Sequence, residues 1–260
     1  LTLAAWLVAF GAHAQLGEGD ITVSATQGVE WDQANQVYIA RGEAVVKQGT
    51  VEVYGDTLFA FYRDAGSGAN AASATGSIYR IEAVGKVRAL LDGDQLNADK
   101  LIYNFDTGIV DAIGGQPSFK TSDGLLVQAG QALKYDPRAL RAYALGTVMA
   151  YDRESRIKAN EMTLFFFPAE TGRQPSRIQS VLAKGRVIVD QEEGVAEADE
   201  LLYDPVNRLA ELKGNVNLLQ PNGSIVSGEF VSFDFESGLG QVLADDKKRV
   251  TVVIKPGEAP

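Results

Sequence analysis

The sequence predicts an all-β protein built from repeated strand pairs, and two observations support this prediction. Apolar residues alternate with polar ones along most of the chain, which is the pattern of strands with one buried face. In addition, a glycine preceded by apolar residues recurs six times. About thirteen to fifteen residues after it comes a small residue, followed by apolar residues at alternate positions. Such periods indicate stacked supersecondary units, whose extended surfaces favour binding over catalysis.

The two clearest copies of this element run from Gly85-Lys-Val87 to Ala98-Asp99-Lys-Leu101-Ile-Tyr103 and from Gly185-Arg-Val187 to Ala198-Asp199-Glu-Leu201-Leu-Tyr203. The other four begin at Gly42, Gly114, Gly146 and Gly214. We expect each glycine to open a strand. At this spacing the chain holds about twelve to sixteen strands.

Turn signals separate the expected strands. Asn222-Gly223 predicts a hairpin, because both residues tolerate positive φ. Two insertions, residues 64 to 77 and 168 to 177, are rich in small, polar or proline residues and are expected to form flexible loops.

The composition excludes several kinds of site. An apolar content of 45% is enough for a core, and the net charge of −10 argues against a nucleic-acid partner. The chain has no cysteine, so it has neither a disulfide framework nor a thiolate metal site. We expect no metal and no cofactor.

The first fourteen residues have the features of a signal peptide. Residues 1 to 10 are uncharged and apolar, but too few to span a bilayer, and Ala12-His13-Ala14 has the small-x-small form of a cleavage site. An amphipathic first strand or helix is the alternative. We expect cleavage after Ala14, and a single domain over residues 15–260 with a flexible tail from about residue 256. Cleavage would also remove His13, the only histidine, and with it the commonest general base.

Six aspartates recur near the repeats, and they raise the question of catalysis. A glycosidase needs two carboxylates about 5 to 10 Å apart in a cleft. Aspartates at equivalent positions of a repeat are better explained by turns or caps. Asp92-Gly93-Asp94 and Glu192-Glu193 lack the spacing of a calcium loop and are expected to be solvated turns. We therefore expect no enzyme. The six residues are Asp56, Asp99, Asp136, Asp199, Asp204 and Asp234.

The repeat resembles the OstA-like repeat of lipopolysaccharide-transport proteins, whose form is a Gly-x-Val strand, a turn, and then Ala-Asp-x-Leu/Val-x-Tyr. The segment from Asp246 to Pro256, where Lys247, Lys248 and Arg249 lead into a valine-rich strand, is similar to the last strand of the soluble periplasmic bridge component, the LptA type. The resemblance covers roughly residues 20 to 256.

Two departures from the family pattern leave alternatives open. The chain is longer than the bridge component, and Ala129-Gly130 and Ala159-Asn160 stand where the repeat has Ala-Asp. The periplasmic N-terminal domain of the outer-membrane assembly component is one alternative. A structural or saccharide-binding β-solenoid is the other.

The resemblance implies a twisted, partly open β-jellyroll whose apolar interior shields the acyl chains of lipid A, the lipid part of lipopolysaccharide, during transport from the inner to the outer membrane. It implies no reaction and a periplasmic location. No nucleotide-binding Gly-Lys-Ser/Thr loop is present, so a separate ATPase would supply the energy. For each residue the alternative is ordinary core packing. The residues expected to line the groove are Val87, Leu101, Tyr103, Val148, Leu164, Phe166, Val187, Leu201, Tyr203, Val216 and Phe233.

Two β-branched runs, Ile21–Ala25 and Val250–Ile254, are expected to be edge strands. Edge strands can add to a partner's sheet through main-chain hydrogen bonds. The implied partners are the inner-membrane and outer-membrane transport components, or further copies of the chain joined head to tail. The alternative is that both runs pair within the molecule. The residues expected at these edges are Ile21, Val23, Val250, Val252 and Ile254.

Overall fold

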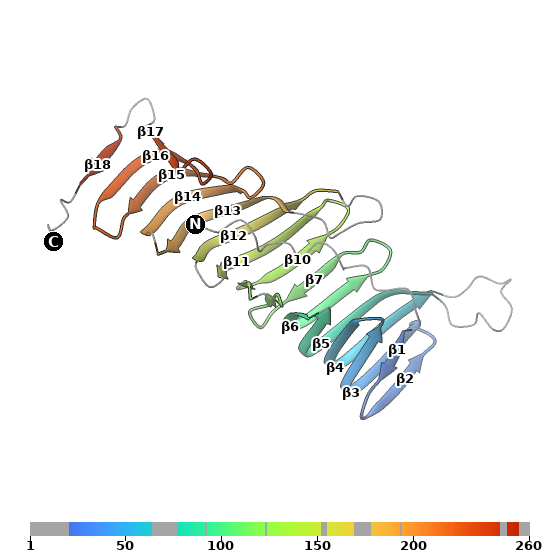
Figure 1. Ribbon diagram of the computed structural model, residues 1–260. Coiled ribbons are helices and arrows are strands. Elements are labelled where there is room, and N and C mark those ends of the chain that lie inside the picture. The colour runs from blue at the N-terminus through green and yellow to red at the C-terminus, as the bar shows by residue number, and fades with distance from the viewer. Residues whose placement is uncertain are drawn as a thin grey trace.

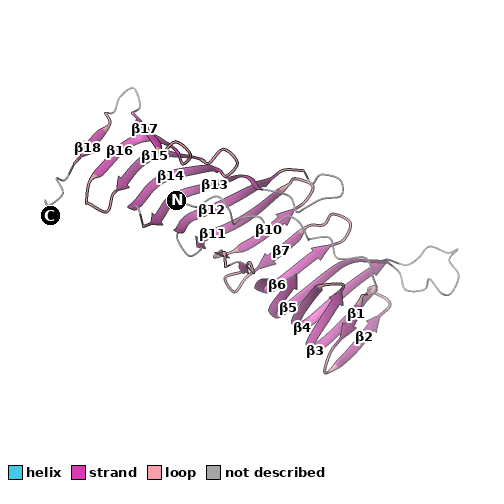
Figure 2. Ribbon diagram, in the orientation of Figure 1, coloured by secondary structure: helices cyan, strands magenta, loops and turns pink. Residues whose placement is uncertain are grey.

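The computed structural model describes residues 21–63, 77–91, 93–122, 124–151, 155–168, 178–192, 194–244 and 249–254. These residues form a long antiparallel stack of eighteen strands (Figures 1 and 2). The strands are β1 (Thr22–Ser24), β2 (Gly28–Asp32), β3 (Val37–Gln48), β4 (Val51–Arg63), β5 (Ser77–Leu91), β6 (Asp94–Asn104), β7 (Val110–Ile113), β8 (Ser118–Lys120), β9 (Leu126–Gln128), β10 (Ala132–Asp136), β11 (Arg141–Tyr151), β12 (Ser155–Phe166), β13 (Ile178–Gln191), β14 (Gly194–Asp204), β15 (Leu209–Leu219), β16 (Ile225–Asp234), β17 (Leu239–Leu243) and β18 (Thr251–Val253).

The count exceeds the expected twelve to sixteen because some strands are interrupted. The pairs β1/β2, β7/β8, β9/β10 and β17/β18 each follow the course of one long strand but break in the middle. Counting each pair as one strand leaves fourteen long strands out of eighteen. Each long strand runs antiparallel to its neighbours, so the strands form one continuous meander. The predicted all-β class is confirmed.

Every long strand takes part in two facing sheets. Sheet I contains β2, β7, β10 and β17 together with one half of each uninterrupted strand. Sheet II contains β1, β8, β9 and β18 together with the other halves. The two sheets share a bend that crosses the whole stack and enclose one apolar core. This arrangement is the expected twisted, partly open β-jellyroll (Figure 1).

The repeat glycines make the bend. At Gly85 (φ 80°) and Lys86 (φ 47°), two residues of β5 lie opposite the single residue Asp99 of β6, so the pairing register shifts. The same glycine bulge recurs at Gly42, Gly146, Gly185 and Gly214. A bulge bends a strand without ending it. The expectation that each glycine opens a strand was therefore wrong, because the glycines lie in the middle of long strands.

The repeat aspartates fall into two groups. As predicted, three aspartates accept hydrogen bonds from backbone N–H groups in the four-residue turns at the edge of sheet I; they are Asp136, Asp204 and Asp234. Asp56, Asp99 and Asp199 lie at the bend instead, each beside a glycine of the next strand. A Cβ at Gly214, for example, would meet the Cβ of Asp199 at 2.9 Å. For these three residues the turn prediction was wrong, because close packing at the bulge sets the residue type there.

The predicted Asn222-Gly223 hairpin is confirmed between β15 and β16, where the Gly223 N–H donates to the Gln220 carbonyl at 2.8 Å. Several other predictions lie outside the described residues. They are the signal peptide over residues 1–14, residues 64–76 and 169–177 of the two insertions, Lys247 and Lys248, and the tail from residue 256. Among the described residues, no helix is long and apolar enough to cross a membrane.

Candidate functional site

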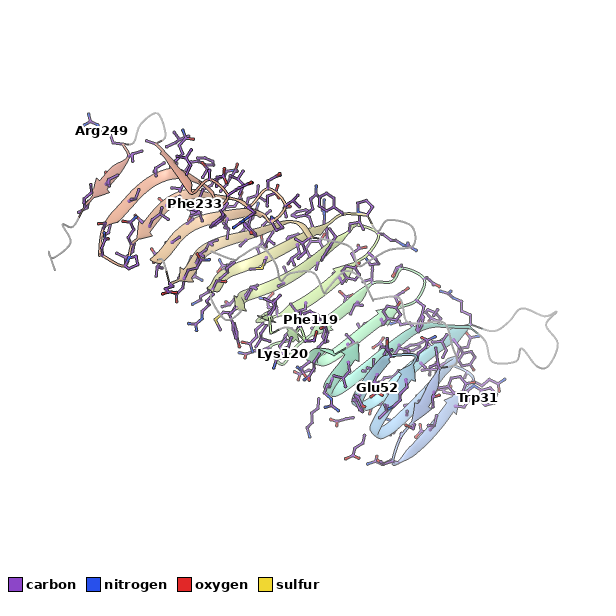
Figure 3. All side chains as sticks on the ribbon, in the orientation of Figure 1. Trp31, Glu52, Phe119, Lys120, Phe233 and Arg249 are labelled. Atoms are coloured by element: carbon purple, nitrogen blue, oxygen red, sulfur yellow. The ribbon has the colours of Figure 1, made fainter. Side chains whose placement is uncertain are left out.

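An apolar cavity of about 230 Å³ opens inside the jellyroll near its C-terminal end. Both sheets contribute to it, from β12 through β16, and the surface is almost entirely aliphatic or aromatic. Figure 3 shows the labelled Phe233 in this part of the stack. The lining residues are Ile157, Val181, Val189, Gln191, Gly194, Val195, Ala196, Leu201, Tyr203, Ala210, Leu212, Leu218, Leu219, Gln220, Val231, Phe233 and Phe235.

The eleven residues predicted to line a groove all face the interior, but few of them reach this cavity. Leu201, Tyr203 and Phe233 line it. Tyr103 and Phe233 are half-buried, and the other nine are buried. In this structure Val87, Leu101, Val148, Leu164, Phe166, Val187 and Val216 pack in the core instead.

The middle of the interior is filled by side chains. Tyr135 and Phe166 meet edge to face with ring centroids 5.9 Å apart. Met162 and Val148 are almost completely buried in the same core. Edge-to-face aromatic pairs and close-packed aliphatic groups fill the interior at this point. The interior is therefore packed with side chains around Tyr135 and Phe166, and the cavity lies further along the stack, from β12 to β16.

Sequence reasoning missed most of the cavity. Ala196 and Ala210 leave space because their side chains are small, and Val189, Leu218 and Phe235 surround that space. Small inward residues next to aromatic ones are not a sufficient signal, because Ala142 next to Tyr135 shows the same pattern in the packed middle. Locating the cavity still needed the pairing of strands from both sheets.

The rim of the cavity on sheet I is held by turns that carry aromatic side chains. The Phe235 ring lies 6.1 Å from that of Tyr203 and 4.8 Å from that of Phe233, both edge to face. Its backbone N–H donates to the Arg208 carbonyl at 2.9 Å, which links two neighbouring turns. These contacts fix the rim aromatics at the edge of the sheet.

Charges stay at the rim and outside the cavity. Burial raises the pKa of Asp204, but hydrogen bonds from Asn207 and Val206 outweigh it and hold that pKa below its usual value. The Ser237 and Glu236 N–H groups lower the pKa of Asp234 in the same way. Burial raises the pKa of the Tyr203 phenol, which keeps it neutral. The cavity is therefore lined by apolar residues together with the neutral Tyr203, Gln191 and Gln220.

Unpaired strand edges lie at both ends of the stack. Among the described residues, β1 and β2 pair only with β3, and β17 and β18 pair only with β16. The predicted edge residues lie on or beside β1 and β18; they are Ile21, Val23, Val250, Val252 and Ile254. Large apolar side chains are exposed there, with Trp31 59% and Ile254 75% accessible. Figure 3 shows Trp31 and Arg249 at opposite ends of the molecule.

A bent antiparallel stack with an apolar interior and unpaired edges at both ends defines a class of elongated β-jellyroll binding scaffolds. Within the described residues, no cluster of three or more acidic or histidine side chains could hold a metal ion. The family model described as "LptA/(LptD N-terminal domain) LPS transport protein" matches residues 80–238. The chain belongs to that family of lipopolysaccharide-transport proteins and is not an enzyme.

The comparison with solved structures gives LptH of Pseudomonas aeruginosa, described as the LptA-homologous periplasmic component of the lipopolysaccharide-transport device. That chain is 14% identical over 93% of this one and 99% of its own length, with a TM-score of 0.22. No curated protein sequence matches the chain.

Proposed function

We propose that this protein is a periplasmic carrier that binds lipopolysaccharide and shields the acyl chains of its lipid A on the way from the inner to the outer membrane. The apolar cavity between β12 and β16, in a member of a lipopolysaccharide-transport family, is the observation that supports this most directly. The acyl chains enter the cavity, and the phosphosugar head stays in water at the rim.

The physical balance favours binding despite the negative charge of the protein. Each buried methylene contributes about 0.8 kcal/mol, so an acyl chain of about twelve carbons gains on the order of 8 kcal/mol before ordering costs. The net charge of −10 acts through water, where repulsion is screened beyond a Debye length of about 8 Å. The free energy gained by burying the acyl chain therefore exceeds the repulsion between exposed like charges.

In this proposal an acyl chain occupies the observed cavity, and a longer groove requires the interior to open further. Most of the remaining predicted residues pack in the core, from Val87 on β5 to Val216 on β15. In the described part of the chain, the two sheets meet along the bend and through the packing of their inward side chains. We infer that lipid separates the facing side chains of the two sheets while the backbone ladders stay intact.

The strand edges at both ends supply the partner contacts in this proposal. β1 and β18 offer free main-chain groups to the inner-membrane and outer-membrane components, and strand addition uses such groups. The family description also names the N-terminal domain of LptD, so a jellyroll domain of the outer-membrane component is the second candidate.

Site-specific photo-crosslinking in a Gram-negative cell tests the proposal. A crosslinker in place of Phe233 should give lipopolysaccharide adducts, because that ring borders the cavity. Lys184, whose exposed side chain pairs with Glu200 at 3.2 Å on the outer face, is the matched control and should give none. If neither Phe233 nor Tyr203 yields adducts in the folded protein, the carrier function is wrong.

A further inference from the structure

Aromatic side chains recur along the edge of sheet I that lies opposite the bend. Each sheet ends there in turns, and the last inward side chains before these turns border the opening between the two sheets. Each aromatic residue follows another inward residue two positions earlier in its strand, as Tyr203 follows the buried Leu201. We call this set the aromatic rim, and its members are Tyr62, Phe105, Tyr135, Phe166, Tyr203 and Phe235.

Sheet II has a different chemistry along its facing edge, where several of the last inward side chains end in a neutral amide or hydroxyl group. Gln191 takes the inward position after Val189 on β13, and Gln220 takes the inward position after Leu218 at the end of β15. We call this set the polar rim, and its members are Gln48, Thr121, Ser155, Gln191, Gln220 and Ser224. The opening therefore has an aromatic side and a hydrogen-bonding side.

At the cavity, two members of the polar rim lie on either side of a glycine. Gln191 pairs directly with Gly194, and a Cβ at Gly194 would lie 3.3 Å from the Gln220 Cα. Neighbouring strands are about 4.8 Å apart, so the two glutamines lie about 10 Å from each other across the glycine. All three residues line the cavity. Because Gly194 has no side chain, space remains between the two side-chain amides at the edge of the cavity.

The two amides can serve as hydrogen-bonding groups for a neutral ligand. Gln191 is half-buried and Gln220 is exposed, so both side chains are accessible from the opening. A glutamine amide offers two N–H donors and one carbonyl acceptor and carries no charge. It therefore matches ligand groups that accept or donate hydrogen bonds without charge, such as amide, ester and hydroxyl groups.

Charged groups lie on the opposite side of the opening. Asp204 and Asp234 belong to turns of sheet I, and Arg208 is close enough to Asp234 to lower the pKa of that carboxyl group. On the sheet II side, the residues that line the cavity carry no charge. Anionic ligand groups such as phosphate are usually bound by arginine or lysine. The two glutamines are therefore better suited to a neutral group.

We propose that Gln191 and Gln220 bind the amide or ester linkage of an acylated ligand in the space over Gly194, while the acyl chain lies in the cavity. The inference rests on the proposed function, since lipid A holds its acyl chains through such linkages, and it adds which part of the ligand lies at the cavity edge. Each linkage marks the start of an acyl chain, so the polar rim sets how deeply the chain enters. Tyr203 and Phe235 cover the first methylenes from the aromatic rim.

Two uncharged ligands with the same hydroxyl head group test the linkage. N-decanoylethanolamine has an amide between its chain and its head group, and 2-(decyloxy)ethanol has an ether there. The natural chain should bind the amide at least about fivefold more tightly, because each neutral hydrogen bond changes affinity by about twofold to tenfold. Isothermal titration calorimetry below the micelle concentration of each ligand measures both affinities. Equal affinities for the two ligands overturn the proposal.

Methionine substitutions test the two glutamines, because methionine keeps the length of the side chain but cannot donate a hydrogen bond. In a protein with Gln191→Met and Gln220→Met, the preference for the amide should fall to about twofold or less. Affinity for the ether should stay within about twofold. Gln128→Met is the matched control and should keep the full preference, since Gln128 follows the inward Val127 and lies on the outer face of sheet II. A folded double variant that still prefers the amide overturns the proposal.

The two proposals can fail separately. If Phe233 gives lipopolysaccharide adducts but the amide and the ether bind equally, the carrier function stands and the linkage site is wrong. If the amide preference depends on the two glutamines but neither Phe233 nor Tyr203 gives adducts, the linkage site stands and the carrier function is wrong. If neither small ligand binds, the linkage site is wrong, and the crosslinking experiment alone decides the carrier function.

Discussion

The middle of the jellyroll and its C-terminal third are built from the same alternation, yet one is a packed core and the other holds a cavity. Between β10 and β12, Met162, Leu164 and Phe166 occupy successive inward positions and fill the space. Between β13 and β16, residues of both sheets line a cavity instead, although small inward residues occur in both regions, such as Ala142 in the middle and Ala210 here. The comparison shows that strand pattern sets which side chains face inward, while their volume decides whether the interior is solid or hollow.

Truncating one aromatic ring in each region should give the largest difference in stability between the two regions. Phe166→Ala is expected to lower the free energy of unfolding by about 3–5 kcal/mol, because it leaves a cavity in a close-packed core. Phe233→Ala should cost only about 1–2 kcal/mol, since that ring is half-buried and already borders a cavity. Urea unfolding of the two variants measures the difference, and equal losses would show that the cavity region is packed as tightly as the middle.

A larger side chain at an inward position should lower stability in the middle region and lipid binding in the cavity region. Ala142 and Ala210 occupy the same inward row. Ala142→Leu is expected to destabilise the protein by about 1–3 kcal/mol through overpacking. Ala210→Leu should leave stability nearly unchanged, because the added carbons enter the cavity, and should reduce lipopolysaccharide crosslinking at Phe233 severalfold.

Thermal unfolding and crosslinking on the same two preparations check this prediction. Unchanged lipid adducts in a folded Ala210→Leu protein would mean that acyl chains bind elsewhere. A stable Ala142→Leu protein would mean that the middle opens more readily than its packing indicates.

The smallest effect is expected at the rim turns. Asp204→Ala removes hydrogen bonds to the Val206 and Asn207 N–H groups and should cost about 1 kcal/mol at pH 7. The folded pKa of Asp204 lies below its unfolded value, so its stabilisation is present above about pH 4 and is lost as pH falls through the folded pKa. The stability difference between natural chain and variant should therefore shrink between pH 5 and pH 2. A difference that stays constant over this range would contradict the assigned role of the carboxylate.

The repeat pattern predicted the aspartates correctly where their hydrogen bonds reach only neighbouring residues. Asp136, Asp204 and Asp234 cap turns because their carboxylates reach N–H groups two or three residues ahead, which depends on neighbouring residues alone. Asp56, Asp99 and Asp199 have the same residue type but lie at the bend, beside glycines on the next strand. The first group follows tyrosine or phenylalanine and the second follows alanine or glycine, but the contact of the second group with those glycines arises only from pairing between strands.

The sequence by itself determined the all-β class, the inward parity of all eleven predicted interior residues, and the two edge runs at the ends, because a two-residue period and β-branched composition are properties of single strands. Only the tertiary structure decided that the repeat glycines form a shared bend, that the middle is filled, and that the cavity lies between β12 and β16. These features depend on which side chains from two sheets meet across the interior. Their combined volume is set by distant parts of the chain and appears only when the strands are paired.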